Sequence, residues 1–229
     1  MGVSAILPIH DEATVLGRVL DAIDRQSWRP DELVCVLDDC RDESEAIVRT
    51  RPAKVVRVKV RNTAAALAAG ISETSHEILL LFDGNTLVPI DYAARLLEAF
   101  ETTGADLVEW HGGMMLLPRS TLDRYGPFSR MHLWTLEYFL RVESRGGQVV
   151  RLNGPHKRLK RSPLGRNIRY GLDYSALVER YGIAPFFRIG TKSGWIPDLF
   201  AAIGTIVGHV KNRRLWRALQ ALPGAIRDR

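Results

Sequence analysis

Cysteine is scarce in this chain of 229 residues. The two cysteines, Cys35 and Cys40, are too few for a disulfide framework, and neither has a partner Cys or His at zinc-binding spacing. We expect a buried small residue and a loop residue at these positions. Because hydrophobic residues make up 46% of the sequence, we predict a globular protein whose core forms without disulfides or structural zinc.

A membrane-spanning run is also lacking. The apolar segment IPDLFAAIGTIVGHV (196–210) is too short to cross a bilayer, and it contains Pro197, Asp198 and two glycines. It is flanked by KNRRLWR, so it fits an interfacial helix and an ordinary packing helix equally well. No basic leader or small-residue cleavage site precedes the first apolar run at Val3, and we therefore expect a cytoplasmic protein.

Acidic residues are sparse in the last third of the chain. Residues 1–150 contain 16 Lys and Arg against 22 Asp and Glu, whereas residues 151–229 contain 16 against 4. A basic segment of this kind is typical of a solvated face, a nucleic-acid site, an anionic membrane surface or a site for a phosphorylated ligand. No recognisable nucleic-acid-binding module is present, so we expect no nucleic-acid partner.

Short β-branched runs alternate with helical patterns along most of the chain. Apolar runs of this kind predict strands of a mostly parallel sheet that is covered by helices on both faces. We therefore predict an α/β three-layer sandwich, with a basic, helical C-terminal appendage. The predicted strands are residues 3–9, 33–38, 55–60, 77–82, 106–110, 114–118 and 148–152, and the predicted helices are residues 12–25, 43–50, 64–71, 89–102 and 131–147.

Acidic side chains follow three of the predicted strands. Asp11 and Glu12 follow the first strand, Asp38 and Asp39 the second, and Asp83 the fourth. Each acid could simply cap a helix or begin a turn, but ligands of parallel sheets bind at this edge, where the carboxyl ends of the strands meet. In the sequence Asp83-Gly84-Asn85, two oxygen-bearing side chains flank a glycine, so both can face one hard cation such as Mg²⁺ or Mn²⁺.

The residues at this edge resemble a known family. VSAILPIHDEATVLGRVLDAIDRQSWRPDELVCVLDDCRDES (3–44) is similar to the opening of the family two glycosyltransferases, which have a Rossmann-like, nucleotide-diphospho-sugar transferase fold. The matching residues are Pro8, Glu12, Gln26, Glu32, Asp38, Asp39 and Asp42. ILLLFDGNTLVP (78–89) resembles the family's metal-binding Asp-x-Asp strand end, and LLPRSTLDRYGPF (116–128) resembles its later Arg and Gly-Gly-Phe segment.

The resemblance implies a nucleotide-diphosphate sugar as donor. Pro8, Ile9 and His10 would line the nucleobase site, while Glu12 and either Asp38 or Asp39 would accept hydrogen bonds from the base and ribose. Asp83 would contact the ribose or a metal-bound water. Asn85 stands where the family usually has Asp, and its neutral amide oxygen can coordinate a cation but adds no charge. His156 would be a third metal ligand or a diphosphate contact, and a surface histidine is the alternative.

The family's usual catalytic base is not matched in this sequence. Many relatives have a Glu-Asp pair where this chain has Trp134 and Thr135, and Glu137 is the only acid nearby. Glu137 is therefore the candidate base, and a solvated helix residue is the equal alternative.

TLEYFLRVESRGGQVV (135–150) also resembles the polyprenyl-phosphate sugar transferases of the dolichyl-phosphate mannose synthase type. A phosphate acceptor is already ionised near neutral pH, so it requires cationic positioning more than proton removal. The residues that could provide it are Arg119, Arg158, Arg161 and Arg166.

These expectations describe an inverting glycosyltransferase over residues 1–165 and a basic extension over residues 166–229. The acceptor is a lipid phosphate or a saccharide, and the extension would lie on an anionic membrane surface at the cytoplasmic face. A nucleotidyltransferase is disfavoured, because the first strand lacks a glycine-rich turn. A catalytically weak or inactive nucleotide-sugar-binding subunit remains the alternative.

Overall fold

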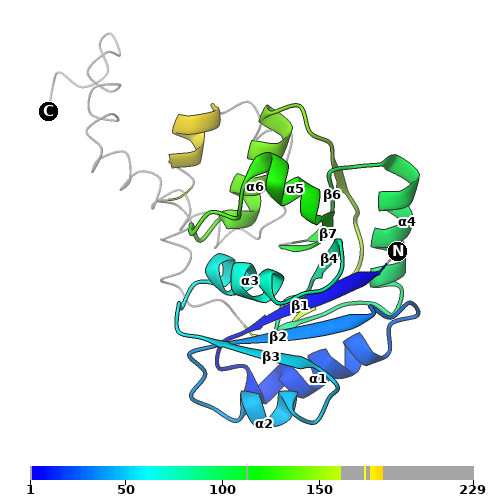
Figure 1. The fold of residues 1–229 in the computed structure, drawn as a ribbon, viewed down its shortest axis with the longest axis vertical. Coiled ribbons are helices and arrows are strands. Elements are labelled where there is room, and N and C mark those ends of the chain that lie inside the picture. Colours follow the sequence, from blue (N-terminus) through cyan, green and yellow to red (C-terminus); the bar gives the residue numbers. More distant parts are fainter. Residues whose placement is uncertain (1, 112, 161–172, 174–175, 183–229) are drawn as a thin grey trace, which may run out of the picture. The chain divides into compact units, whose positions relative to one another are not determined.

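The computed structural model describes residues 2–111, 113–160, 173 and 176–182 (Figure 1). The chain divides into two compact units. The first comprises Met1–Arg130 and Trp134–Arg161, and the second comprises Met131–Leu133 and Ser162–Arg229. The predicted appendage, including the apolar segment 196–210, lies almost entirely outside the described residues.

A seven-stranded, mostly parallel sheet forms the centre of the first unit, with the strand order β3-β2-β1-β4-β7-β6-β8. β1 pairs in parallel with both β2 and β4, which makes it the middle of the parallel half. The strands are β1 (Val3–Ile9), β2 (Glu32–Asp38), β3 (Lys54–Val58), β4 (Ile78–Leu81), β6 (Leu107–His111), β7 (Met114–Pro118) and β8 (Val149–Arg151).

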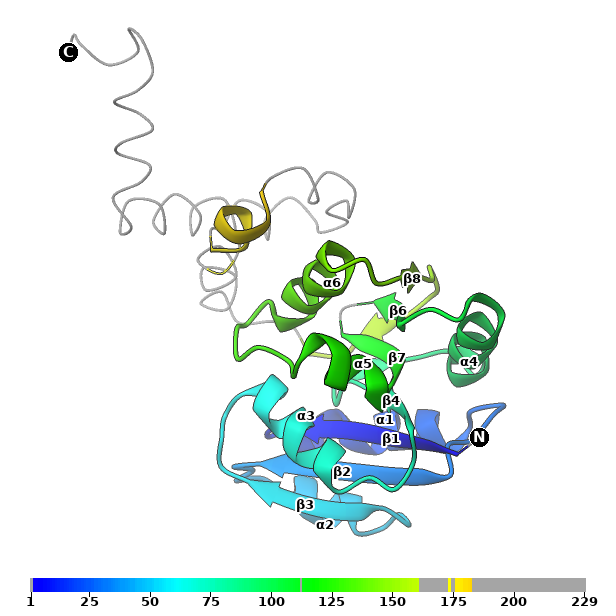
Figure 2. The ribbon, with the colours of Figure 1, turned by 45° about the horizontal axis from the view of Figure 1, so that its top comes forward.

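Six helices of this unit are described, and they cover both faces of the sheet (Figures 1 and 2). One apolar cluster joins one face to α1, α2 and α4, and the other cluster joins the opposite face to α3, α5 and α6. The predicted three-layer α/β fold is confirmed. The helices are α1 (Ala13–Asp24), α2 (Ser44–Val48), α3 (Thr63–Ser72), α4 (Tyr92–Thr103), α5 (Arg119–Tyr125) and α6 (Trp134–Ser144).

Both faces of the sheet are buried, and successive side chains of each strand point to opposite faces. In β1, Val3, Ala5, Leu7 and Ile9 belong to the first cluster and Ile6 belongs to the second. Because both sets of side chains are buried, the strand reads in the sequence as a continuous apolar run.

The alanine-rich sequence of α3 also has a packing reason. A Cβ atom added at Gly70 would lie 2.6 Å from Val36 Cγ2 and 2.8 Å from Ile6 Cγ2. The helix therefore lies directly on β1 and β2, and small residues on this face permit that approach.

β7 is antiparallel to both of its neighbours within the mostly parallel sheet. Its pairing with β6 follows from the short connection between the two strands, since a parallel pair needs a long crossover. Two features differ from the sequence-based expectation. α5 was not predicted. The basic stretch after residue 153, where no strand was predicted, contains β9 (Lys157–Arg158), and this strand pairs with β5 (Thr86–Leu87) in a small separate sheet.

α4 begins at Tyr92 instead of Pro89, and a side chain from the segment just after α1 caps its first turn. Buried Gln26 donates a hydrogen bond to the Pro89 carbonyl at 2.8 Å, and its Oε1 accepts one from Ala93 N at 2.9 Å. The amide of Gln26 thus satisfies a backbone donor of the first turn, which would otherwise be unpaired. This contact explains the Gln near the end of the first helix that the family pattern contains.

Little of the second unit is described. Within it, Leu133 N donates to Asp173 Oδ2 at 3.0 Å, and residues 176–181 are helical. Among the described residues of both units, no helix has the length and apolar character needed to cross a membrane.

Candidate active site at the carboxyl ends of the strands

The loop after β1 is held by contacts from distant parts of the chain. Asp11 has a left-handed backbone with φ of 51°, which costs energy for a residue other than glycine. Its side chain accepts a hydrogen bond from Arg41 N at 2.7 Å, and its carbonyl accepts one from Lys160 Nζ at 2.5 Å. His10 Nδ1 lies 2.5 Å from the Asp38 carbonyl, so the ends of β1 and β2 are joined directly.

The two acids at the end of β2 have different environments. Asp38 is 4% exposed, and its carboxylate accepts hydrogen bonds from the backbone N–H groups of Val60, Arg61 and Asn62 at 2.8, 2.8 and 3.0 Å. It therefore fixes the chain that leaves β3. Asp39 is only partly buried and lies 3.5 Å from Arg41 and 3.6 Å from Arg61. Of the two predicted ribose contacts, Asp39 has the more accessible carboxylate.

Asp83, Gly84 and Asn85 form a tight turn after β4. Asp83 Oδ1 accepts a hydrogen bond from Asn85 N at 3.0 Å, and Oδ2 accepts one from Thr86 Oγ1 at 3.1 Å. A Cβ atom added at Gly84 would lie 2.8 Å from the Pro8 carbonyl oxygen. The turn therefore lies against the end of β1, and this close approach requires glycine.

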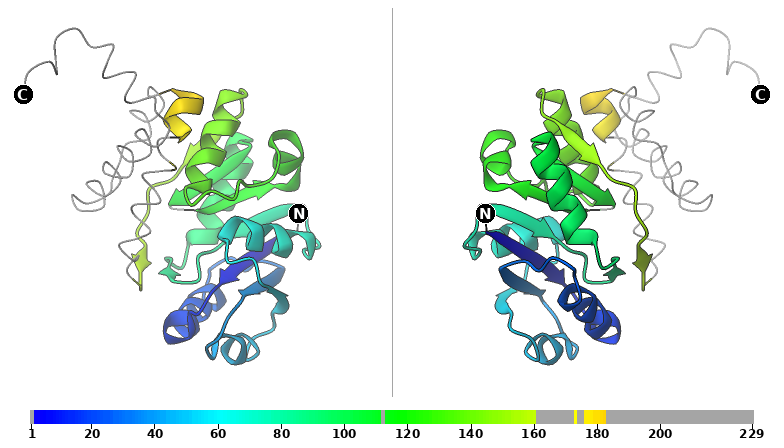
Figure 3. Two further views of the ribbon diagram at one scale, coloured as in Figure 1. Left: turned by 90° about the vertical axis from the view of Figure 1, so that its left-hand side faces the viewer. Right: turned by 90° about the vertical axis from the view of Figure 1, so that its right-hand side faces the viewer.

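β9 brings positive charge to this edge. Leu159 N donates to the Asn85 carbonyl at 2.8 Å, and Figure 3 shows β9, in yellow-green, alongside β5. Arg158 lies 3.7 Å from Asp83 Oδ2, and Lys160 Nζ lies 2.7 Å from Glu12 Oε2. The sequence pointed to Arg158 as a phosphate contact, but neither its pairing with Asp83 nor any role for Lys160 could be deduced from local pattern.

His156 is exposed, and its Nδ1 lies 3.4 Å from the Gly154 carbonyl. The antiparallel ladder pairs Thr86 with Arg158 and Leu87 with Lys157. This register carries the chain at His156 away from Asp83, so the ladder does not bring the predicted third metal ligand to the turn. Its metal role stays a prediction.

Glu137 is not available as the predicted base. It is fully buried, and both of its carboxylate oxygens accept hydrogen bonds from the Arg141 guanidinium. Arg141 also donates to the carbonyls of Tyr125 and Pro127 at 3.1 and 2.7 Å. The pair ties α6 to the chain after α5, and this structural role corrects the sequence-based assignment.

Arg119 lies at the opposite edge of the sheet. Its backbone N–H donates to the Glu77 carbonyl, just before β4 begins, and its guanidinium donates to the carbonyls of Ile71, Thr74 and His76. Because Asp83 follows the other end of β4, Arg119 cannot act with it, and the predicted catalytic role is wrong. Arg161 and Arg166 lie outside the described residues.

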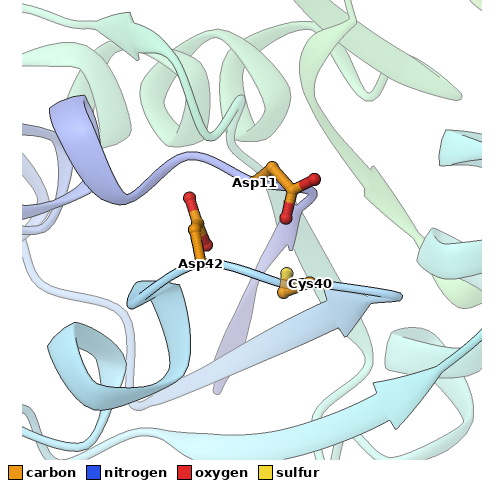
Figure 4. Close-up of side chains that lie close together, drawn as sticks. All are labelled: Asp11, Cys40 and Asp42. Carbon is orange, nitrogen blue, oxygen red and sulfur yellow. The ribbon is translucent and has the colours of Figure 1, made fainter.

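Asp11, Cys40 and Asp42 form a cluster that the sequence did not suggest (Figure 4). Their ligand atoms all lie within 4.8 Å of one another. Burial raises the pKa of the Cys40 thiol, and the charges of Asp42 and Asp11 raise it further. The protonated thiol is a poor metal ligand.

The Asp42 carboxylate already accepts hydrogen bonds from two backbone N–H groups. It accepts hydrogen bonds from Ala13 N at 2.8 Å and Ser44 N at 3.0 Å. Burial raises the pKa of Asp42, but hydrogen bonds from Ser44 and Ala13 and the charge of Lys160 outweigh this effect and lower it on balance. The cluster therefore connects the loops after β1 and β2, and it offers no clear ligand set.

The sequence model of glycosyl transferase family 2 matches residues 4–150, which is more than half of the chain. The chain belongs to glycosyl transferase family 2. This assignment confirms the resemblance found in the sequence, and it makes the protein a glycosyltransferase whose family region contains β1 to β7 and the acids described above. No curated protein gives a significant match.

Solved structures of other glycosyltransferases are similar in fold. Glucosyl-3-phosphoglycerate synthase from Mycobacterium tuberculosis, in complex with Mn²⁺, UDP and glucosyl-3-phosphoglycerate, has a TM-score of 0.70 and 19% identity, and the match covers 80% of each chain. Its complex with Mn²⁺, UDP-glucose and glycerol 3-phosphate has a TM-score of 0.70 and 20% identity over the same shares. The Mg²⁺ and UDP complex is equally similar, with a TM-score of 0.70 and 19% identity over the same shares.

Proposed function

We propose that this chain transfers a sugar, with inversion, from a nucleotide-diphosphate sugar to an acceptor, using Mn²⁺ or Mg²⁺. The observation that supports this most strongly is the meeting of three strand ends at one edge. His10 contacts the Asp38 carbonyl, and Gly84 lies against Pro8, so Glu12, Asp39 and Asp83 gather around the end of β1. Structures with the same fold bind UDP or UDP-glucose and a divalent metal.

In this proposal the donor's base lies against Pro8, Ile9 and His10. Asp39 and Glu12 accept hydrogen bonds from the base and ribose, and Asp38 acts indirectly, because its carboxylate holds residues 60–62. The left-handed backbones of Asp11 and Asp39 are strained positions of the kind that collect at binding sites.

The turn at Asp83 and Asn85 fits a hard cation. It offers one carboxylate and one amide oxygen at i and i+2, and the Asp83 side chain is 27% exposed. A divalent cation there would neutralise the leaving diphosphate. The β5–β9 register leads His156, the predicted third ligand, away from these two residues. The neutral amide of Asn85 lowers the expected affinity for the metal ion.

The acceptor is proposed to carry a phosphate. With Glu137 paired to Arg141 and buried, the described residues leave no assigned base, and an acceptor phosphate needs none because it is ionised near neutral pH. Arg161 and Arg166, which the sequence predicts for this role, would position it. A lipid phosphate has this chemistry, because its own phosphate oxygen would attack the sugar. A small phosphate ester such as phosphoglyceric acid, which the similar synthase binds, would be held through its phosphate but would accept the sugar on a hydroxyl, and that does require a base.

A donor screen tests the proposal. Thermal shifts with UDP-, GDP-, ADP- and TDP-sugars should show stabilisation by one nucleotide that increases with Mn²⁺. Asp83→Ala should remove the Mn²⁺-dependent part, whereas Asp106→Ala, at the other end of the sheet, should keep it. An undiminished shift in Asp83→Ala would show that the site assignment is wrong. Transfer assays with polyprenyl phosphate and with 3-phosphoglycerate then distinguish the two acceptor classes.

A second candidate function is nucleotide-sugar binding without transfer. The structural role of Glu137 and the amide at Asn85 favour it, because both reduce the catalytic equipment. Metal-dependent hydrolysis of the identified donor separates the candidates. A slow release of free sugar supports the enzyme, and tight binding with no turnover supports the binding subunit.

Membrane association is a separate part of the proposal, and it is supported by the charge of residues 151–229. Each Lys or Arg near an anionic surface contributes about 1 kcal/mol, so a few suffice for peripheral attachment. The full chain should sediment with vesicles containing phosphatidylserine and not with neutral vesicles. Binding that is unaffected by deletion of residues 171–229 would contradict it.

A further inference from the structure

The segment Lys157–Lys160, here called the basic strap, supplies counter-ions to two acids of the site. Arg158 faces Asp83, and Lys160 faces Glu12. Between the two cations, Leu159 packs against the first apolar cluster.

The position of the strap is fixed from both sides of Arg158. Before it, Lys157 pairs with Leu87 in the β5–β9 ladder. After it, Leu159 N donates to the Asn85 carbonyl and Lys160 Nζ donates to the Asp11 carbonyl. These anchors hold the backbone on both sides of Arg158, so its side chain starts from a fixed position close to Asp83.

This arrangement has an electrostatic consequence. The distance from Arg158 to Asp83 Oδ2 is 3.7 Å, so a divalent cation held by Asp83 would lie within a few ångströms of a guanidinium. Two like charges at that separation repel each other. A diphosphate beside them carries enough negative charge to contact both, and guanidinium and phosphate form strong paired hydrogen bonds.

We infer that Arg158 couples cation binding at Asp83 to binding of the donor's diphosphate. Arg158 opposes the cation when no phosphate is bound, and it favours the ternary complex once the phosphate is present. The inference rests on the proposed function, since it takes Asp83 as a metal ligand. It adds that metal and donor bind cooperatively through one named side chain.

The test measures Mn²⁺ binding to the full chain by electron paramagnetic resonance of free Mn²⁺. Arg158→Gln should bind Mn²⁺ alone about threefold more tightly than the wild type, a size that fits a partly exposed charge pair. Arg158→Lys retains the charge and should resemble the wild type. Lys157→Gln, the adjacent exposed cation, is the matched control and should change the affinity less than about 1.5-fold.

A second arm measures UDP and inorganic pyrophosphate binding by calorimetry at saturating Mn²⁺. Here Arg158→Gln should bind both about threefold more weakly, which is the opposite direction from the first arm. Pyrophosphate makes this arm independent of the nucleobase. General damage to the fold would weaken both kinds of binding, so it cannot imitate the opposite changes.

The inference is overturned if Arg158→Gln leaves Mn²⁺ affinity unchanged or lowers it. Asp83→Asn separates this failure from failure of the proposed function. If Asp83→Asn abolishes Mn²⁺ binding while Arg158→Gln has no effect, only the coupling is wrong. If Asp83→Asn binds Mn²⁺ as well as the wild type does, the metal assignment itself is wrong.

Discussion

At the scale of single residues, two adjacent acids with similar sequence context have different structural roles. Asp38 is buried and accepts three backbone hydrogen bonds, whereas Asp39 faces two arginines near the surface. Side chains alternate across a strand and its exit, so adjacent residues point to different environments. The pair is therefore one structural acid followed by one candidate ligand-binding acid.

This difference predicts opposite phenotypes. Asp38→Ala leaves three backbone N–H groups without their acceptor and should lower the free energy of unfolding by about 2–4 kcal/mol. Asp39→Ala should change it by less than about 1 kcal/mol, because exposed ion pairs contribute little, and should weaken nucleotide binding instead. Urea unfolding and calorimetry measure the two effects. Equal destabilisation by both substitutions would contradict the distinction.

Two glycines provide another matched pair. A Cβ at Gly84 would meet the Pro8 carbonyl oxygen at 2.8 Å, whereas a Cβ at Gly17, within α1, has no atom within 4 Å. Gly84→Ala should displace the turn, lower the stability by about 1–3 kcal/mol and weaken Mn²⁺ binding. Gly17→Ala should raise the melting temperature, since alanine is favoured over glycine in helices by about 1 kcal/mol. Thermal unfolding and Mn²⁺ binding of both variants test this prediction. A Gly84→Ala variant with wild-type stability and Mn²⁺ affinity would show that the turn tolerates a Cβ.

At the scale of elements, α6 depends on a buried ion pair. Glu137→Ala removes the buried carboxylate that pairs with the Arg141 guanidinium, which should cost about 3–5 kcal/mol. Glu137→Gln keeps the shape of the side chain and should cost less. Once folded, it should retain transfer activity within about threefold of the wild type, because a lost general base costs at least about 100-fold. Activity per folded molecule, corrected with a circular dichroism melt, tests whether this carboxylate is structural.

At the scale of the whole molecule, acid sensitivity should depend on ion pairs between elements. Glu45 in α2 accepts hydrogen bonds from Arg57 in β3 and from Arg49, and these contacts lower the pKa of Glu45 from 4.5 to about 2. A lowered pKa in the folded state means that the unfolded state binds the proton more tightly. This contribution is therefore present above pH 4.5 and is lost as the pH falls towards about 2.

The prediction concerns the pH dependence of unfolding. Between pH 6 and pH 3, the urea midpoint should fall less in Glu45→Gln than in the wild type. The effect should be small, because the pair is exposed to solvent. Glu43→Gln, at the residue just before α2, is the control and should follow the wild type. A Glu45→Gln profile parallel to that of the wild type would show that the pair does not contribute to acid stability.

The order of strands and helices and the acids after β1, β2 and β4 could be predicted from the sequence. Apolar runs and helical spacing are local signals, and parallel strands must place their carboxyl ends at one edge. The same local signals missed β9 and α5, because both are short, and they left the direction of β7 open, because strand direction depends on the connection and not on the run itself.

Only the tertiary structure decided what the individual charges do. Asp38 is committed to residues 60–62, Glu137 to Arg141, and Arg119 to the loop before β4. Lys160 reaches the Asp11 carbonyl across 149 residues of sequence. A carboxylate or guanidinium has the same local pattern whether it binds substrate, backbone or a partner, since its role is set by the groups that folding brings within about 3 Å of it.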